Sequence, residues 1–427
     1  MRAGTGLAAA AGIAAALAAA GSGCGGSGGQ AACDLDAAGT ICTIAGSGEN
    51  GYSGDDGPAP DAQMSLPQDT LWAQDGSLYI LDWNNHRVRR LTTDGVIHHV
   101  AGRGELGGTL DDPANSDFNH PTGIIFDPTG RLLVIAAWHN SQVTTVDLQN
   151  GDIVDICGDG RRAYFGDEGP AATASLDLPA SIVYDKDDNL VIMDQANQVI
   201  RRVDTDGIIH HVAGQCILDR PPPEGPGPCD APVACPGGSG KLTCGDPAAT
   251  CTTFRNPGYA GDDGPAAELR MSQPFGQSAD PAGRIAYDRD GNLLFADTTN
   301  AIIRKIDKDG MVTRVAGLEP VEGAAQTGYS GDGGPATEAK LHQPVDLAVA
   351  DSGTVYFTDV SNHCVRAIDP DGTIRTAVGR CGERGYEGDG GPAEEALLKL
   401  PFGVEWAQGT LYISDSGNSV IRAVEVE

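Results

Sequence analysis

The sequence repeats itself at long intervals. A strand-like segment that ends in glycine occurs six times, and the first three steps between these glycines are 56 residues each, followed by steps of 103 and 62 residues. A unit of this length cannot bury its apolar face alone, so neighbouring copies must pack against each other. The chain is therefore predicted to be an array of six units with an insertion in the long step. The glycines are Gly46, Gly102, Gly158, Gly214, Gly317 and Gly379.

Each unit shows the pattern of a four-stranded antiparallel meander. In the first unit, strand-like segments at residues 69–74, 77–82 and 86–91 precede the glycine-ending segment at residues 96–102. Asp-Gly and Asn-Gly pairs between alternating apolar segments indicate hairpins, because these turns need positive φ. Six such units predict an all-β fold, a six-bladed β-propeller.

The two ends of the chain are predicted to close the ring. The last unit stops after its third strand at residues 420–427, and residues 41–46 form an isolated fourth strand near the N-terminus. Pairing these two strands removes an open sheet edge. The predicted propeller covers residues 41–427, with a Cys- and Pro-rich insertion at about 215–257.

A second landmark is a Gly/Asp loop followed by Pro-Ala, as in GYSGDGGPA at residues 328–336, with a degraded copy at residues 109–114. A short helical turn and a second proline follow it. Together with Asp-x-x-Asn-x-x-(Val/Ile)-Arg, Asp-Gly and Val-Ala-Gly, this pattern resembles the NHL repeat family over residues 41–427, apart from the insertion. The resemblance implies a β-propeller that serves as an interaction platform. A minority of the family are lyases, lactonases or receptor sensor domains.

Five units carry an aspartate and an arginine seven residues apart, and the functional alternative is a ring of polar ligands. In the second unit both are replaced, by Ala137 and Thr144, whereas Asn140 is kept. Joint loss is expected of a buried ion pair, because one orphaned charge is costly. We therefore predict structural Asp–Arg pairs: Asp82 with Arg89, Asp194 with Arg201, Asp297 with Arg304, Asp359 with Arg366, and Asp415 with Arg422.

The candidate metal ligands are few. The Gly/Asp loops favour a tight turn with Asp capping, and Ca²⁺ binding is the alternative. Metal-dependent amidating lyases of similar fold place histidine after the second proline, facing the central channel, and no histidine stands there. One position further, Asp69 and Asp346 are weak metal candidates, and Gly276 takes this place in the fourth unit. The nine histidines show no ligand-like clustering, and no catalytic residue or cofactor site is predicted.

The N-terminus indicates export. Arg2, an Ala-rich apolar stretch at residues 7–20 and small residues after it predict a signal peptide at residues 1–23. Residues 24–40 then form a flexible Gly/Ser-rich tether. Cys24 is a candidate lipidation site, with ordinary signal cleavage as the alternative. The predicted location is the periplasm, the outer membrane or cell surface as a lipoprotein, or the medium.

The 11 cysteines favour disulfides in an oxidising compartment. Cys364 and Cys381 flank one hairpin and are predicted to pair. The insertion lacks the paired spacing of a zinc site, so disulfides are also predicted there. Cys33, Cys42 and Cys157 are expected to supply the remaining partners, in a connectivity left open. The insertion cysteines are Cys216, Cys229, Cys235, Cys244 and Cys251.

The charge and the loop arrangement bound the function. With 28 basic and 59 acidic residues, the net charge of −31 argues against nucleic acid as a partner. Because strands alternate in a meander, the Gly/Asp loops, the Asp-x-x-Asn corners and the insertion share one face. We predict a monomeric, non-catalytic binding propeller of the cell envelope that recognises a protein or envelope ligand through this face. The alternative is a metal-dependent enzyme of the lactonase or lyase class.

Overall fold

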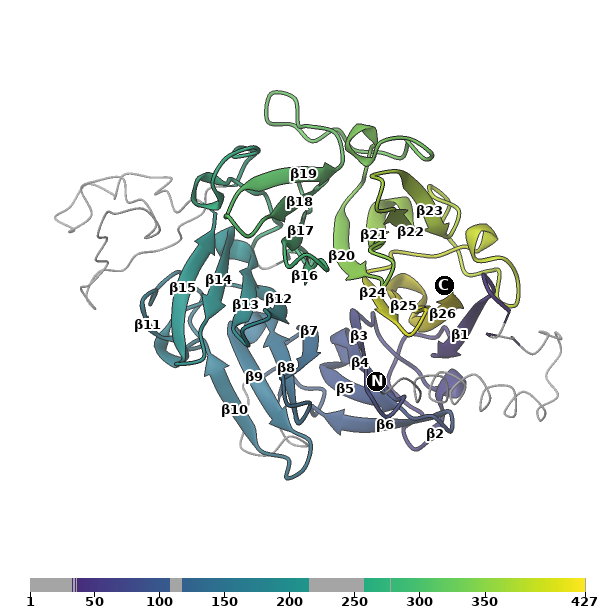
Figure 1. The fold of residues 1–427 in the computed structure, drawn as a ribbon. Helices are drawn as coiled ribbons and strands as arrows, with labels where there is room; N and C mark the ends of the chain where they lie inside the picture. Colours follow the sequence, from purple (N-terminus) through teal and green to yellow (C-terminus); the bar gives the residue numbers. More distant parts are fainter. Residues whose placement is uncertain are drawn as a thin grey trace, which may run out of the picture.

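Six antiparallel sheets surround a central axis (Figure 1). The computed structural model describes residues 33, 35, 37–107, 117–214, 257–276 and 278–426. Apart from β1 and the two-residue strands β2 and β11, neighbouring strands within each sheet follow one another in the chain, so each blade is built as a meander. The prediction of an all-β, six-bladed β-propeller is confirmed.

The first three blades follow one another from the N-terminal side. Blade 1 contains β2 (Gly57–Pro58), β3 (Asp69–Trp72), β4 (Leu78–Asp82), β5 (Arg87–Leu91) and β6 (Val96–Ala101). Blade 2 contains β7 (Pro121–Phe126), β8 (Leu132–Ala137), β9 (Gln142–Asp147) and β10 (Ile153–Cys157). Blade 3 contains β11 (Gly169–Pro170), β12 (Pro179–Tyr184), β13 (Leu190–Asp194), β14 (Val199–Val203) and β15 (Ile208–Ala213).

The other three blades complete the ring. Blade 4 contains β16 (Ile285–Tyr287), β17 (Leu293–Asp297), β18 (Ile302–Ile306) and β19 (Val312–Ala316). Blade 5 contains β20 (Pro344–Val349), β21 (Val355–Asp359), β22 (Cys364–Ile368) and β23 (Ile374–Val378). Blade 6 contains β24 (Gly403–Ala407), β25 (Thr410–Asp415), β26 (Val420–Glu425) and β1 (Ile41–Ala45).

The helices of the described residues are three-residue 3-10 turns, and none is long or apolar enough to cross a membrane. They occupy two places in the blade. One set follows the Pro of the Gly/Asp loops: η1 (Ala59–Asp61), η5 (Ala171–Thr173), η7 (Ala266–Glu268), η8 (Ala336–Glu338) and η10 (Ala393–Glu395). The other set turns the corner from second to third strand: η2 (Trp83–Asn85), η4 (Trp138–Asn140), η6 (Gln195–Asn197), η9 (Val360–Asn362) and η11 (Ser416–Asn418).

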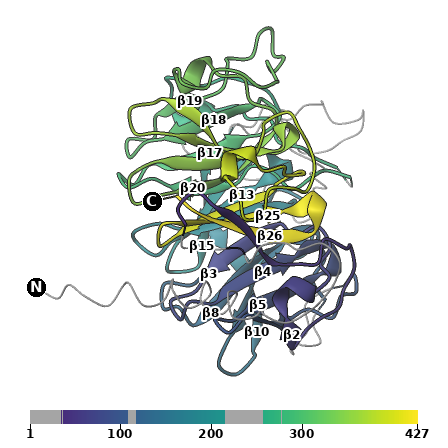
Figure 2. The ribbon, with the colours of Figure 1, turned by 90° about the vertical axis from the view of Figure 1, so that its right-hand side faces the viewer.

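The ring is closed by the two ends of the chain. Strand β1 pairs antiparallel with β26, and Ile41 faces Val424 in this ladder. Figure 2 shows the purple N-terminal strand beside the yellow strands β25 and β26. The predicted closure is confirmed, because β1 becomes the outer strand of a blade that would otherwise have only three.

The hydrophobic core lies between the blades. Each of six apolar clusters joins two neighbouring sheets; one of them packs Ile44 and Ile421 of blade 6 against Leu78 and Ile80 of blade 1. A strand in the middle of a blade therefore packs against a neighbouring blade on each side. All five residues of β4 are buried, for example.

Two disulfides are present in the described residues. Cys364 and Cys381 are joined, as predicted. Cys33 and Cys42, whose connectivity the sequence left open, are joined to each other across only nine residues. Cys157, the third expected partner, is a buried free thiol on β10.

The N-terminal predictions and the insertion stay outside this description. The signal peptide, the tether up to residue 32 with Cys24, and the five cysteines of the insertion lie beyond the described residues. The predicted boundaries at residues 23, 40, 215 and 257 stay predictions.

The Cys364–Cys381 disulfide closes a loop with a sequence separation of 17. Replacing both cysteines by alanine should lower the free energy of unfolding by about 3 kcal/mol, because the unfolded chain regains the entropy of that loop. Urea denaturation of the double variant measures this loss. As a control, variant and wild type should unfold at similar midpoints when both are fully reduced, because neither then has a disulfide. A variant as stable as the oxidised wild type would contradict the prediction.

Candidate binding face

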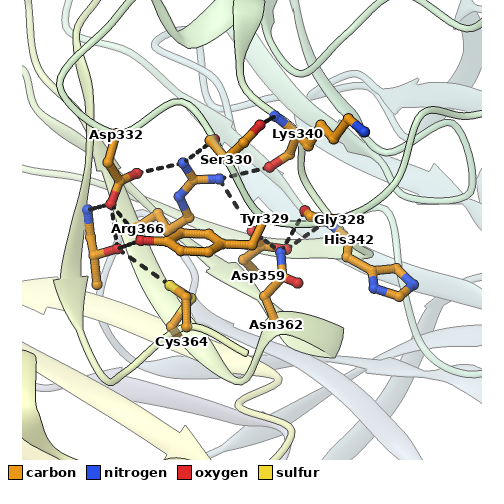
Figure 3. Close-up of polar contacts among 12 residues, drawn as sticks. Gly328, Tyr329, Ser330, Asp332, Lys340, His342, Asp359, Asn362, Cys364 and Arg366 are labelled. Carbon is orange, nitrogen blue, oxygen red and sulfur yellow. Dashed lines mark hydrogen bonds and ion pairs between the residues drawn. A yellow bond between two sulfur atoms is a disulfide. The ribbon is translucent and has the colours of Figure 1, made fainter. Parts of the chain in front are cut away.

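The repeated unit of each blade is organised around a buried arginine, shown for blade 5 in Figure 3. Arg366 on β22 donates through Nη1 to the Asp359 carboxylate at 3.5 Å and through Nη2 to the Asp332 carboxylate at 2.5 Å. It also donates to the carbonyls of Lys340 and Ser330. The Tyr329 ring lies 5.1 Å from the guanidinium carbon. One side chain thus holds the corner, the Gly/Asp loop and the third strand together.

The corner aspartate supplies the second half of this unit. Asp359 accepts hydrogen bonds from the backbone N–H of His342 at 2.7 Å and from the Asn362 amide at 2.8 Å. The same amide of Asn362 donates to the carbonyl of Gly328, which belongs to the Gly/Asp loop. Because both carboxylate oxygens are used, this aspartate is a structural linker.

The structure places all ten aspartates and arginines of the sequence prediction in this arrangement, and their side chains are fully buried. The Asp–Arg distances are 3.4 Å for Asp82–Arg89, 3.5 Å for Asp194–Arg201, 3.0 Å for Asp297–Arg304, 3.5 Å for Asp359–Arg366 and 4.0 Å for Asp415–Arg422. Each arginine also contacts an aspartate of its own Gly/Asp loop: Asp55, Asp167, Asp262, Asp332 and Asp389.

Blade 2 shows how the unit works without its charges. Where the other blades use the corner aspartate, Asn140 Oδ1 accepts the backbone N–H of Asn119 at 2.7 Å. At the arginine position, the Thr144 hydroxyl donates to Asp155 at 2.7 Å on the neighbouring strand. Neutral partners therefore replace the ion pair, and no buried charge is orphaned.

The Gly/Asp loop is a tight turn whose carboxylate is already in use. Gly331 has φ of +96°, and a Cβ there would lie 2.7 Å from the backbone of Ala339. The Asp332 carboxylate accepts from Arg366, from the Tyr329 hydroxyl and from Thr376. Its oxygens are thus directed at protein donors, and this geometry favours the structural interpretation over Ca²⁺ binding.

Burial dominates the electrostatics of the corner aspartates. It raises the pKa of Asp359 to about 6 and that of Asp415 to about 7, although Arg366 and Arg422 oppose the shift. The ion pairs are thus buried at the cost of desolvation, which hydrogen bonds from backbone and asparagine offset in part.

In the fourth unit, the residue beside the central axis differs from the one predicted from the sequence. Gly276, which was expected beside the axis, lies in a loop. Arg284 takes the position equivalent to Asp69 and Asp346, immediately before β16. Its carbonyl accepts a hydrogen bond from the backbone N–H of Ala296 on β17, which sets this register. Residues 275–282 are a second, short insertion. The sequence carried a signal for it: Pro274 precedes Asp290-Gly291 by 16 residues, twice the usual spacing.

Arg284 crosses the axis from blade 4 to blades 1 and 2. Its Nη1 lies 2.7 Å from the Asp69 carboxylate, and its Nη2 donates to the carbonyl of Thr122. Asp69 also accepts the backbone N–H of Ile124 at 3.1 Å. Asp346 in turn accepts the backbone N–H of Val404 at 2.9 Å, so each of the two metal candidates links neighbouring blades.

A third carboxyl lies near these two. Glu405 on β24 accepts the backbone N–H of Trp72, and burial together with Asp69 and Asp346 raises its pKa to about 8. Burial, partly opposed by Arg284, raises the pKa of Asp346 to about 7. Among the described residues, no three His, Cys, Asp or Glu side chains are arranged to hold a metal ion.

Residues 274–276 and 278–282 of blade 4 contact several other blades near the centre of the ring. Gln195 on the corner of blade 3 is buried and donates to the carbonyls of Pro274 and Asp280 at 2.8 and 2.9 Å. Ala279 packs against a cluster that contains Trp138 of blade 2. On the other side, Pro281 and Ala282 line a small pocket with residues of blades 5 and 6, among them Val345 and Phe402.

Three histidines lie together although they are not arranged as metal ligands. The rings of His86 and His139 lie 4.3 and 4.9 Å from that of His120, on the same face, next to Trp83 and Trp138. Burial lowers the pKa of His86 and His139 to about 4. The three come from different segments of blades 1 and 2, so spacing along the chain could not reveal them.

The loops that lead into the first strands expose large apolar side chains. Of the ten such exposed residues in the described chain, seven lie in these loops, and each of the six loops contributes at least one. We call this surface the loop face. The seven residues are Tyr52, Leu106, Phe165, Phe275, Val321, Tyr329 and Tyr386.

The fold and the buried Asp–Asn–Arg units define an NHL-type β-propeller. The model of the teneurin NHL domain matches residues 39–234 and 324–385, and the chain belongs to this family.

Curated relatives and solved structures agree with this fold. The chain is 26% identical to Teneurin-3 of Mus musculus over 400 residues, which is 86% of this chain and 13% of Teneurin-3. It is 24% identical over 335 residues to the chloroplastic protein SUPPRESSOR OF QUENCHING 1 of Arabidopsis thaliana, which is 77% of this chain and 27% of that protein. The chain thus spans only a small part of either relative.

Two solved structures from Bacteroides thetaiotaomicron share the fold. A structural genomics protein of unknown function superposes with a TM-score of 0.59 at 17% identity, covering 91% of this chain and 76% of that chain. An auxiliary nutrient binding protein superposes with a TM-score of 0.56 at 15% identity, covering 90% and 75%.

Removing one partner of a buried pair should be far more damaging than removing both. Arg366→Ala leaves the Asp359 carboxylate buried without its cation, and the free energy of unfolding should fall by about 3–5 kcal/mol. The double variant Asp359→Ala/Arg366→Thr copies blade 2 and should lose less than this single variant. Chemical denaturation measures both. Arg289→Ala, which breaks an exposed pair with Asp351, is the control and should change stability by less than about 1 kcal/mol.

Glu405 should make stability depend on pH. Its folded pKa of about 8 lies above its ordinary value of about 4.5, so its stabilising contribution is complete below pH 4.5 and is lost as the pH rises through 8. Glu405→Gln should therefore gain stability relative to wild type as the pH rises from 4.5 to 8, as denaturation at several pH values would show. Glu395→Gln in an exposed turn is the control, and a constant difference between Glu405→Gln and wild type would contradict the prediction.

Proposed function

We propose that this chain is an exported, non-catalytic binding propeller that recognises a partner protein or envelope ligand through the loop face. The observation that carries the proposal is the concentration of exposed large apolar residues there, seven of ten among the described residues. Large exposed apolar groups clustered on one surface mark interaction sites, because their burial in a complex is favourable. The buried arginine units hold the loops that present them, so the surface is preorganised.

The comparisons and the covalent structure support this proposal. One structural neighbour is named an auxiliary nutrient binding protein, which is consistent with a propeller that binds rather than reacts. Two disulfides in the described residues are typical of an oxidising compartment. We therefore propose that the protein is exported, with Cys24 as the proposed lipid attachment site and a monomer as the proposed state.

The alternative of a metal-dependent lactonase or lyase needs side chains that converge on one ion. At the centre of the ring, Asp69, Asp346 and Glu405 instead accept backbone N–H groups of neighbouring blades, and Arg284 binds Asp69. These carboxyl groups hold the ring together, and the geometry favours the binding protein.

A crosslinking pull-down from envelope extract tests the loop face. The variant Tyr52→Ala/Phe165→Ala/Tyr386→Ala should lose most of the crosslinked partner, because its apolar contacts are gone. The matched control, Leu148→Ala/Val154→Ala/Met311→Ala, removes the three exposed apolar residues outside the loop face and should keep it. A chain without residues 215–257 should also lose the partner if the insertion contributes specificity. Equal capture by all variants would refute the proposal.

A further inference from the structure

Three of the exposed loop-face residues are tyrosines from consecutive blades. Tyr329, Tyr386 and Tyr52 precede the first strands of blades 5, 6 and 1, which are neighbours because β1 closes blade 6 beside blade 1 (Figure 1). Their exposed fractions are 44%, 41% and 41%. The Tyr386 hydroxyl lies 3.0 Å from the Thr43 hydroxyl on the outer strand of blade 6, as the Tyr329 hydroxyl lies 3.1 Å from the Thr376 hydroxyl on the outer strand of blade 5. We call these three residues the tyrosine arc.

One side of each ring in the arc is already occupied. Tyr329 and Tyr386 lie over the guanidinium groups of Arg366 and Arg422 at 5.1 and 5.7 Å, and Tyr52 lies over Arg87 at 3.9 Å. The exposed surface of each ring is therefore held in a set orientation. A partner would bind to these rings at a small cost in side-chain entropy.

Carboxylates adjoin every ring of the arc. The Tyr329 hydroxyl donates to Asp332 at 2.9 Å, and the Tyr52 hydroxyl donates to Asp55. For Tyr386 the link passes through the Thr43 hydroxyl, which donates to Asp389 at 2.7 Å. Arg366 is shared by two carboxylates, so the buried cation below Tyr329 does not make that unit positive.

The charge of the arc differs from that of the blade 3 loop on the same face. The three loops at residues 47–61, 325–338 and 382–395 contain eleven acidic residues and one basic residue, Arg384. The corresponding loop of blade 3, at residues 159–173, contains three acidic residues with Arg161 and Arg162. Phe165 in that loop is as exposed as Tyr329, at 44%. Aromatic exposure is common to both regions, and the two adjacent arginines of the blade 3 loop have no counterpart in the three loops of the arc.

We propose that the tyrosine arc binds a lysine- or arginine-rich segment of a partner protein, an inference that rests on the proposed function of the loop face. Each ring offers its electron-rich surface to a cation, and the adjacent carboxylates supply the ion pair. Both interactions select the same side chains, Lys and Arg, and both disfavour an acidic partner. Three such sites on adjacent blades recognise several basic residues of one chain together.

Fluorescence anisotropy with a labelled peptide of alternating Lys and Gly tests this proposal on the full chain. The variant Tyr52→Leu/Tyr329→Leu/Tyr386→Leu keeps apolar side chains and the net charge of −31, and its affinity for the peptide should fall about tenfold or more. Phe165→Leu, on the same face beside Arg161 and Arg162, is the matched control and should change the affinity less than twofold. The corresponding Tyr→Phe triple variant keeps the rings and should keep most of the binding, which separates ring loss from misfolding.

The outcomes decide between three explanations. Equal binding of the Lys-Gly peptide by wild type and the Tyr→Leu variant would show that net charge alone attracts it and would overturn the proposal. Equal binding of a Ser-Gly peptide would overturn it as well. The Tyr→Leu variant could instead lose the envelope partner and still bind the Lys-Gly peptide as wild type does. That result would support the loop face as the binding surface, but it would overturn the proposed preference of the arc for Lys and Arg. A Tyr→Leu variant that loses both supports the arc.

Discussion

The buried arginine of each repeat is the constraint on which the blade depends. A guanidinium group cannot be taken out of water unless its N–H donors and its charge are compensated. Arg366 meets this condition with two carboxylates and two loop carbonyls. These acceptors come from the corner, from the Gly/Asp loop and from the segment before the first strand. Satisfying one side chain thus fixes the relative positions of three segments, and the same solution occurs in five blades.

This arrangement also explains why a long irregular loop can present exposed aromatic rings. The loop aspartate has one oxygen directed at the arginine and the other at the tyrosine hydroxyl or at a threonine, as Asp332 and Asp389 show. The tyrosine in turn covers the buried guanidinium. The carboxylates that compensate the buried arginines therefore also hold the tyrosine rings at the surface. The proposed binding face is thus a consequence of how each blade is built.

The departures from the repeat divide the molecule into unequal parts. Blade 2 replaces the ion pair by Asn140 and Thr144 and gathers three histidines with two tryptophans beside blade 1. Blade 4 contacts other blades near the centre of the ring through residues 274–276 and 278–282 and sends Arg284 across the axis. Blades 5, 6 and 1 keep the repeat and carry the acidic tyrosine loops.

The sequence by itself determined the number of blades, the closure by β1, the Cys364–Cys381 disulfide and which aspartates and arginines form a unit. These features follow from spacing that repeats along the chain, and the joint loss at Ala137 and Thr144 revealed the pairing. Only the tertiary structure decided the place of Arg284, the histidine cluster, the Cys33–Cys42 disulfide and the grouping of exposed residues on one face. The place of Arg284 and the histidine cluster bring together segments without a common periodicity, and such contacts depend on how blades pack, which no local pattern encodes.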